Sequence, residues 1–378
     1  MCGRIVFITT SPISRLFSEK VDFNGFRALG LETILLDASP LFYSSELLKA
    51  YYAGEKTYQF NDIETITVDS EEAAFQMLKT LGNGDVVWHL SRFFKSVDDD
   101  FIFNALNCKK VPYYLQHFDA MVPQVDFLRI MRMRIRMRYQ KYQSRKLKPC
   151  AVIGSGTYSR LQSEMLYPNS KFISIPSVKV TWNESEKLIE GDYILFVDES
   201  VEYAPDAKLL NYSISSDIEG YYGRMNSLFK TIESWLGKPV VIAASGKYKY
   251  QHDRFEGRPV IYGKTLSLIQ HASLVVGHMS LALEQCLISE IPFLIVDDQS
   301  FTDVKRDGFH ASLLNHIRRP VLNTDVTQDV LVRCATPDMA KMRFLIQSFL
   351  REEDAFEFYH EAVAADFKKT LIEGWTGK

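Results

Sequence analysis

Several signatures of well-known protein classes are missing from this sequence. Its five cysteines are scattered and odd in number, and they form neither a CxxC pair nor a Cys/His cluster. A disulfide framework and a zinc site are therefore not indicated, and a reducing compartment is expected. No apolar run approaches the ~18 residues of a membrane-spanning helix. The opening segment, MCGRIVFITTS, is too short to act as a signal peptide. We expect a cytoplasmic protein, or one that lies peripherally on a membrane.

Acidic residues are absent from one long stretch. No Asp or Glu lies between Phe127 and Ser163, although the 378-residue chain has a net charge of −3. A helix is expected over about 124–147, and its basic residues include Arg132, Arg134, Arg136 and Arg138. Met and Ile alternate with these arginines, and such a pattern suits an anionic membrane surface. A solvated basic face is the alternative. No nucleic-acid-binding motif accompanies the charge, so nucleic acid is not an expected partner.

Short, β-branched apolar runs alternate with segments of helical spacing along the whole chain. Such runs are typical of parallel strands that helices cover on both faces. Strands are expected at 4–9, 31–37, 64–68, 85–90, 111–117, 150–154, 171–176, 191–200, 239–245, 258–263, 273–278 and 292–298. The chain length suggests two domains, and residues 177–190 have the irregular pattern of a connector. The sequence therefore predicts an α/β protein with two successive open sheets, followed by C-terminal helices.

Polar side chains follow three of the strands expected in the second half. At the end of the strand at 239–245 are Ser245, Lys247 and Tyr248. At the end of the strand at 258–263 are Tyr262, Gly263, Lys264 and Thr265, and at the end of the strand at 273–278 are Gly277, His278 and Ser280. Ligands bind open α/β sheets at the carboxyl ends of the strands. The sequence therefore predicts a binding site at this edge.

Four stretches carry a resemblance to a known family. They are VIGSGTYSRLQSEMLYPNSKFISIPS (152–177), YILFVD (193–198), PVVIAASGKYKY (239–250) and the run from VIYGKT to PFLIV (260–296). The last two resemble the donor-binding half of GT-B glycosyltransferases that build bacterial surface polysaccharides. The resemblance implies two Rossmann-like domains facing each other across a cleft. Residues 1–178 would bind the acceptor, and residues 179–351 the nucleotide-sugar. A C-terminal helix at about 352–378 would pack back on the first domain.

The second domain would hold the nucleotide-sugar donor. A diphosphate suits Gly263-Lys264-Thr265, which is expected to begin a helix, although a Thr N-cap beside a solvated Lys is the alternative. His278 is expected to face the cleft, and Glu284 could accept hydrogen bonds from ribose hydroxyls. A structural histidine and a helix-surface glutamate are the alternatives. The expected donor-binding residues are Ser245, Lys247, Tyr248, Tyr262, Gly263, Lys264, Thr265, His278, Ser280 and Glu284.

The first domain would supply the acceptor site and the catalytic base. Transfer needs a group that removes the proton of the acceptor hydroxyl. His117 with Asp119 is the favoured pair, and His89 is the second candidate; each histidine has a structural role as its alternative. The turn after the first strand could contact the acceptor or the donor through Thr10 and Ser11. Asp198–Glu199 and Asp297–Asp298 are not expected to hold a metal, because the resemblance implies none.

We therefore predict a metal-independent glycosyltransferase without a cofactor. It would transfer a sugar from a nucleotide-sugar to a bacterial surface glycan (lipopolysaccharide or capsule) or to its lipid-linked precursor. Such an enzyme would work in the cytoplasm or on the cytoplasmic face of the inner membrane. Ser245-Gly246 stands where relatives have His-Pro, and Ser280-Leu281 where they have Ser-Thr. The alternatives are another GT-B enzyme, such as a nucleotide-sugar epimerase, and a non-catalytic scaffold.

Overall fold

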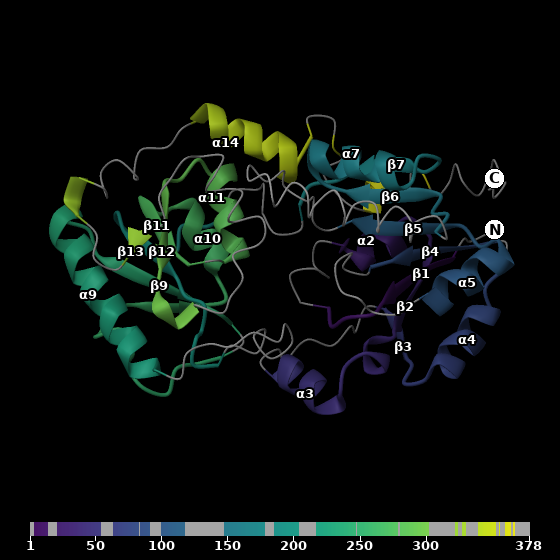
Figure 1. Cartoon of the computed structure of the whole chain (residues 1–378), viewed down its shortest axis with the longest axis horizontal. Coiled ribbons are helices and arrows are strands. Elements are labelled where there is room, and N and C mark those ends of the chain that lie inside the picture. Colours follow the sequence, from purple (N-terminus) through teal and green to yellow (C-terminus); the bar gives the residue numbers. More distant parts are fainter. Residues whose placement is uncertain are drawn as a thin grey trace. The chain divides into compact units, whose positions relative to one another are not determined.

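The computed structural model divides the chain into two compact units (Figure 1). Unit 1 comprises Met1–Lys49, Thr57–Val178 and Gln347–Lys378, and unit 2 comprises Ala50–Lys56 and Lys179–Ile346. Each unit is described by itself. The structure describes residues 4–13, 21–53, 63–82, 84–90, 100–117, 147–177, 185–203, 217–246, 248–278, 280–301, 322–323, 327–329, 339–352, 355, 360–363 and 366.

Unit 1 contains a seven-stranded parallel sheet in the order β3-β2-β1-β4-β5-β6-β7. Its strands are β1 (Arg4–Thr9), β2 (Glu32–Asp37), β3 (Glu64–Thr67), β4 (Asp85–His89), β5 (Tyr113–His117), β6 (Ala151–Gly154) and β7 (Lys171–Ser174). Strands β2 and β3 lie on one side of β1 in the sheet, and β4 lies on the other side of β1. The strand order therefore reverses between β1 and β4, the point at which doubly wound sheets bind ligands.

Helices cover both faces of this sheet. On one face α2 (Phe23–Ala28) packs Phe23 and Phe26 against Phe7 and Trp88. On the other, α4 (Glu71–Lys79), α5 (Asp100–Lys109) and α7 (Gly156–Leu166) contribute a second apolar cluster. Two further segments of the described chain are η1 (Ser39–Leu41) and α3 (Ser45–Ala53). Burial on both faces explains why the strands are apolar without alternation.

The C-terminal part of the chain packs on unit 1. After α14 (Met339–Leu345), a single π-helical segment, η4 (Ile346–Leu350), leads to Glu352. Ser155 Oγ donates to the carbonyl of Phe349 (3.1 Å), and the Tyr158 and Phe349 rings stack with centroids 4.8 Å apart. Further along, Ala362 and Val363 are buried in the same cluster as Trp88.

Unit 2 contains six parallel strands in the order β10-β9-β8-β11-β12-β13. They are β8 (Ile194–Val197), β9 (Val240–Ala244), β10 (Val260–Tyr262), β11 (Leu274–Gly277), β12 (Phe293–Asp297) and β13 (Leu322–Asn323). The order again reverses, here between β8 and β11. Two Rossmann-like α/β units, which the sequence predicts, are thus confirmed.

One long helix packs on the unit 2 sheet. α9 (Ile218–Leu236) begins at Asp217, whose side chain caps Gly220 N, and ends at Gly237, which adopts a positive φ of 64°. Tyr221, Met225, Phe229 and Ile232 lie on its buried face, at helical spacing. Shorter helices follow: α10 (Thr265–Gln270), η2 (Leu281–Leu283), α11 (Glu284–Ile288) and η3 (Gln299–Phe301).

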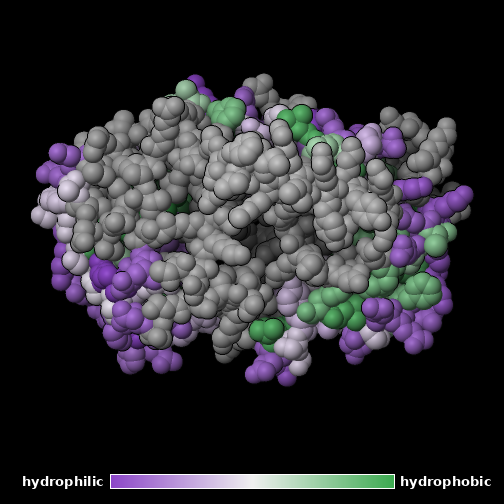
Figure 2. All heavy atoms as spheres, in the orientation of Figure 1, coloured by the Kyte–Doolittle hydropathy of each residue, from purple (hydrophilic) through white to green (hydrophobic). Residues whose placement is uncertain are grey.

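The described surface is mostly hydrophilic where Figure 2 shows it, with apolar residues in small separate groups. Large exposed apolar side chains are scattered over different elements: Leu29, Phe75, Leu161, Met165, Leu188 and Phe344. None of the helices described has the length and apolar character needed to span a bilayer. The expected cationic helix, with Arg132, Arg134, Arg136 and Arg138, lies outside the described residues.

Candidate functional site

The carboxyl edge of the unit 2 sheet is the candidate ligand site. Asp198 follows β8, Ser245 follows β9, Gly263 follows β10, and His278 follows β11. Val197 pairs with Ala243 on one side and with Gly277 on the other, so these strand ends are neighbours. The polar residues that the sequence places after separate strands are therefore brought to one edge.

Asp198 lies at the centre of this edge and is buried, with 7% of its surface exposed. Its Oδ2 accepts hydrogen bonds from Tyr250 Oη (2.5 Å) and Ser200 Oγ (3.4 Å). The Tyr222 hydroxyl, on α9, in turn donates to Tyr250 Oη (3.1 Å). Among the residues that the structure describes, Asp198 Oδ1 has no hydrogen-bond partner. One carboxyl oxygen is thus held firmly, and the other is not.

Burial raises the pKa of Asp198 to about 6, because removal from water disfavours the charged carboxylate. The hydrogen bonds from Tyr250 and Ser200 act in the opposite direction but do not offset the burial. No cation from the described part of the chain contributes to this balance. Asp198 therefore changes its charge within the physiological pH range.

His278 does not have the orientation that we expected from the sequence. Its ring is buried, with 1% exposed. Nδ1 lies 2.8 Å from the carbonyl of Val296, so it carries the proton and donates, and Nε2 accepts from Tyr221 Oη at 3.0 Å. Burial lowers the pKa of His278 to about 4, which keeps the ring neutral. The histidine connects β11, β12 and α9 from inside the unit rather than facing outward.

A second acid at the edge is fully neutralised. Asp298, after β12, accepts from Arg224 Nε (2.7 Å) and Nη2 (2.9 Å) in a two-pronged ion pair. Its Oδ1 also accepts from Ser300 N (2.9 Å). Arg224 comes from α9, so this pair fastens the helix to the end of β12. These contacts hold the pKa of Asp298 below its usual value even though burial acts to raise it.

The ends of β9 and β10 expose backbone rather than large side chains. A Cβ on Gly246 would lie 3.2 Å from the Cα of Gly263, so the two turns pack closely against each other. Gly263 has a positive φ of 69°, which favours glycine. Lys264 beside it is exposed and is the N-cap residue of α10, where we had weighed Thr265 as the cap. α10 itself has only six residues, so its dipole is small.

Aromatic residues border this edge. The Tyr203 and Tyr248 rings are parallel, with an interplanar angle of 1° and centroids 5.2 Å apart. Tyr250 lies 5.9 Å from Tyr203, and its backbone N donates to the Tyr262 hydroxyl (3.1 Å). Partly exposed tyrosines combine an apolar face with a polar tip, which suits contact with a sugar or a base.

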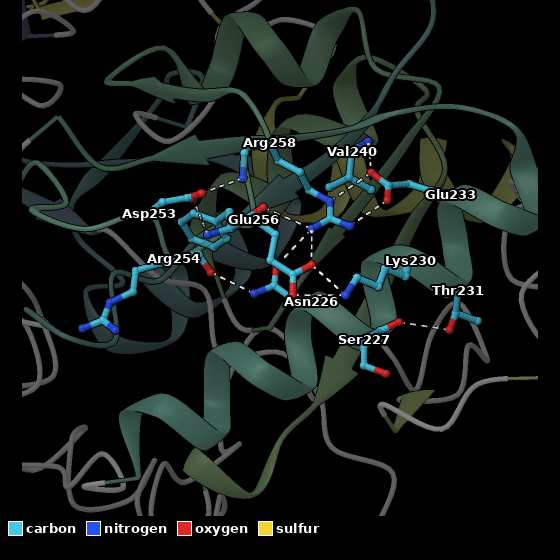
Figure 3. Close-up of polar contacts among 12 residues, drawn as sticks. Asn226, Ser227, Lys230, Thr231, Glu233, Val240, Asp253, Arg254, Glu256 and Arg258 are labelled. Atoms are coloured by element: carbon cyan, nitrogen blue, oxygen red, sulfur yellow. Dashed lines mark hydrogen bonds and ion pairs between the residues drawn. The ribbon is translucent and has the colours of Figure 1, made fainter.

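The loop between β9 and β10, which carries Tyr248 and Tyr250, is anchored to α9 (Figure 3). Arg258 donates to both carboxylate oxygens of Glu233 (3.0 and 2.7 Å) and to Asn226 Oδ1 (3.1 Å). Asn226 Nδ2 donates to the carbonyl of Arg254 (2.9 Å), and Glu233 also accepts from Val240 N. These bonds join α9, the start of β9 and the turn before β10, and so fix the position from which Tyr250 reaches Asp198.

Three further predicted donor residues have different outcomes. Ser280 Oγ accepts weakly from Ala282 N (3.4 Å), at the start of the η2 turn rather than of a regular helix. Glu284 is buried, with 2% exposed, so the helix-surface alternative does not describe it. Its contact with a ribose stays a prediction. Lys247 lies outside the described residues.

The carboxyl edge of unit 1 holds the residues predicted for the acceptor side. His89, at the end of β4, is fully buried with its ring 4.7 Å from Phe103, and burial lowers its pKa to about 3. A general base needs access to the acceptor and a pKa nearer to the working pH, so these observations favour the structural alternative for His89. Thr10 is also buried.

The structure describes only some of the other residues predicted for the acceptor side of unit 1. Thr9 Oγ1 donates to the carbonyl of Ser11, which shapes the turn after β1. His117 is the last residue of β5 and pairs with Gly154, but its side chain and Asp119 lie outside what the structure describes. Within the described residues, no group of three His, Cys, Asp or Glu side chains could hold a metal ion.

Asp198 is the residue of interest that we did not predict as a ligand contact. From the sequence we considered it only as a metal ligand. The signal available was an acid directly after a short apolar run. Asp198 is a candidate ligand contact because it follows β8, the strand at which the order in the sheet reverses.

Comparisons with solved structures identify the fold. MurG from Acinetobacter baumannii aligns over 97% of this chain and 99% of its own, with a TM-score of 0.51 and 10% identity. CalG4, the calicheamicin glycosyltransferase, aligns over 99% of both chains, with a TM-score of 0.54 and 12% identity. The wall teichoic acid polymerase TagF aligns over 98% of this chain and 90% of its own, with a TM-score of 0.54 and 10% identity.

This chain has the GT-B fold. The three similar proteins are GT-B glycosyltransferases, and the similarity extends over both units. No protein-family model matches the sequence, and a search of curated proteins finds no match. At these identities, the similarity establishes the fold alone.

Proposed function

We propose that the protein is a glycosyltransferase that uses a nucleotide-sugar donor. The observation that carries the proposal is the presence of two doubly wound units in one chain, each with its strand order reversing at the fourth strand. This arrangement aligns almost end to end with three glycosyltransferases. Donor and acceptor would each have a Rossmann-like unit, with unit 2 binding the donor.

The donor would bind at the carboxyl edge of unit 2. Exposed Lys264 supplies a positive charge for the phosphates, and the glycine turns at Gly246 and Gly263 allow close approach to the backbone. Tyr248 and Tyr203 offer an aromatic face for a base or sugar. Residues 1–178 would bind the acceptor. With His89 buried, His117 and Asp119 remain the proposed catalytic base pair.

The finer proposal concerns the acceptor. We propose a bacterial surface glycan, such as lipopolysaccharide or capsule, or its lipid-linked precursor. TagF, a wall teichoic acid polymerase, supports this class of acceptor. The run of arginines at 132–138 would place the protein on the anionic cytoplasmic face of the inner membrane. Catalysis would need neither a metal nor a cofactor.

The test of the function is a donor screen. The full-length protein is incubated with UDP-, GDP-, dTDP- and ADP-sugars and with CMP-sugars, and melting temperature and released nucleotide are measured. We expect one nucleotide class to stabilise the protein and its sugar to be transferred or slowly hydrolysed. Lys264→Ala should weaken that binding, whereas Lys230→Ala, a matched exposed lysine on α9, should not. Binding of no nucleotide would overturn the proposal.

Two alternatives give different results in the same screen. A nucleotide-sugar epimerase would change the sugar without any acceptor, and product analysis would detect this. A scaffold would bind a nucleotide or glycan but would neither transfer nor hydrolyse the donor. Ser245-Gly246, in place of the expected His-Pro, is the feature that favours the scaffold.

Membrane association has a separate test. Vesicles with and without anionic lipid are sedimented with the wild type and with a variant in which Arg132, Arg134, Arg136 and Arg138 are replaced by Gln. Binding that requires both the anionic lipid and the arginines is expected. Equal sedimentation of the two proteins would reject the membrane role.

A further inference from the structure

Asp198 occupies an unusual position for an acid. It directly follows β8, where the strand order reverses, and its N donates to Ala243 O (3.0 Å) in the neighbouring strand. The carboxyl group is therefore fixed at the part of the edge where open α/β sheets bind ligands. A buried acid at such a position affects any charged ligand that binds beside it.

Among the groups that the structure describes, none places a positive charge against Asp198. From the loop after β9 comes the Tyr250 hydroxyl, and from its own loop comes Ser200. Glu199, the next residue in the chain, interacts electrostatically with Tyr221. Tyr221 and Tyr222 on α9 both interact electrostatically with it. Beyond these lie the neutral His278 on β11, Asp298 paired with Arg224 on β12, and Arg254 paired with Glu202. Among the described residues, each nearby arginine already has an acidic partner.

Asp298 provides an internal contrast. It stands directly after β12, two strands away in the sheet, and is also buried, with 4% of its surface exposed. The Arg224 guanidinium balances its charge at 2.7 Å. A ligand near Asp298 would meet a neutral pair, whereas a ligand near Asp198 would meet either a neutral acid or an unpaired anion.

We propose that the charge state of Asp198 sets the affinity of unit 2 for phosphate-bearing nucleotide-sugars: loss of its proton weakens binding. The inference depends on the proposed donor site in unit 2. Its physical basis is repulsion between two anions in a poorly solvated region, where charges are screened little. Tyr250 tunes the effect because its hydroxyl hydrogen-bonds the carboxylate and favours the ionised form.

The direction of the pH effect follows from the burial of the carboxyl group. Burial raises the pKa of Asp198 to about 6. Below this pH the acid is neutral and the ligand meets no repulsion; above it the carboxylate opposes binding. Binding should therefore weaken as pH rises from 5 to 8. By linkage, a bound phosphate raises the Asp198 pKa further.

The experiment measures the dissociation constant of one nucleotide-sugar between pH 5 and 8 by calorimetry. The probe is the sugar nucleotide that gives the largest stabilisation in the donor screen. Its esterified phosphates do not titrate in this range, unlike the terminal phosphate of a free nucleoside diphosphate. We expect wild-type affinity to fall about tenfold, the equivalent of one pKa unit of coupling.

Three variants isolate the cause. Asp198→Asn should bind at pH 8 about as tightly as the wild type does at pH 5, with a flat profile. Tyr250→Phe removes the hydroxyl that favours the ionised acid, so the midpoint should move to higher pH. Asp298→Asn, the matched control, should keep the wild-type midpoint. Folding of each variant is checked by its melting temperature, and Tyr250→Phe serves if Asp198→Asn does not fold.

Each outcome decides a different question. A flat wild-type profile, or the same slope in wild type and Asp198→Asn, overturns the role of Asp198 and leaves the proposed function standing. An unmoved midpoint in Tyr250→Phe also contradicts it. Failure of every nucleotide-sugar to bind rejects the proposed function itself, and this inference with it.

Discussion

The first six strands of each unit have the same order in the sheet, but the carboxyl edges of the two sheets carry different side chains. In unit 1 the edge at β1 and β4 holds small hydroxyl residues and His89, whose ring packs on Phe103. In unit 2 the corresponding edge holds Asp198, His278 and Asp298. Tyr221 and Arg224 join His278 and Asp298 directly to α9, and Tyr222 joins Asp198 to it through Tyr250. The same topology therefore carries a histidine packed against a ring in one unit and a polar network joined to a helix in the other.

The two edges also differ in what packs against the glycines that follow their strands. Next to β6, Gly156 in unit 1 lies directly against the backbone of the C-terminal segment at Ser348 and Phe349. Ion pairing of Arg160 with Glu352 fixes that segment. In unit 2 the glycine turns after β9 and β10 contact each other, and Lys264 is exposed. This edge has exposed backbone and an acid, Asp198, that pairs with no described cation, so it is the better candidate for a ligand site.

The largest expected effect concerns the packing of the C-terminal segment on unit 1. Gly156 has a φ of 74°, and a Cβ there would lie 2.5 Å from Phe349 N and from Ser348 O. Gly156→Ala should lower the free energy of unfolding by about 4 kcal/mol through overpacking and strain. Gly30→Ala is the control, because Gly30 has a similar φ of 79° with open space around it. Chemical denaturation of the full chain measures both, and equal losses would contradict the packing.

The second effect depends on pH and belongs to unit 2. The pKa of Asp198 in the folded protein is about 6, above the ordinary value of 3.8, so the folded state holds this proton more tightly than the unfolded state. Its contribution to stability is complete below pH 4 and is lost as pH rises through about 6. Asp198→Asn should therefore be about 3 kcal/mol more stable than the wild type at pH 8, with little difference at pH 4.

Urea denaturation at both pH values measures this difference. A variant less stable than the wild type at pH 8 would show that the carboxylate is compensated after all. Such a result would also remove the electrostatic basis for the ligand effect of Asp198.

The same substitution at the neighbouring acid should act in the opposite direction. Asp298→Asn breaks the bond between Arg224 and a carboxylate whose pKa is held below its usual value. The loss should be about 2 kcal/mol at pH 7, typical of hydrogen bonds to charged groups, and should shrink as acid protonates the wild-type carboxyl. Denaturation curves at pH 7 and at pH 3 test this. A variant that is stabilised at pH 7 would remove the contrast between the two acids.

The smallest expected effect concerns the buried histidine of unit 2. Tyr221→Phe removes the hydroxyl that donates to His278 Nε2. The cost should be about 1 kcal/mol, the net value of one hydrogen bond. Denaturation at pH 7 is the measurement, and no loss for Tyr221→Phe would show that His278 does not need this partner.

Much of the fold could be predicted from local patterns, because a buried parallel strand is a short β-branched run whatever its neighbours are. VVIAA and LVVG, for example, become β9 and β11. The order of strands could not be predicted, because it depends on contacts between distant segments. That order is what distinguishes Asp198, at the end of β8, from other acids after strands.

The orientations of site residues were the least predictable part. A histidine after a strand can turn outward or inward, and Tyr221, 57 positions away, decides the matter for His278. This orientation is set by a tertiary contact that leaves no local pattern in the sequence.

The most direct test of the account is hydrogen exchange of the full chain with and without the nucleotide-sugar that stabilises it. The central claim is that the carboxyl edge of unit 2 is the binding site. We therefore predict protection in peptides covering 198–203, 245–250 and 262–266, with little change at 9–11 and 87–90. Protection confined to the unit 1 peptides, or none in unit 2, would contradict the claim.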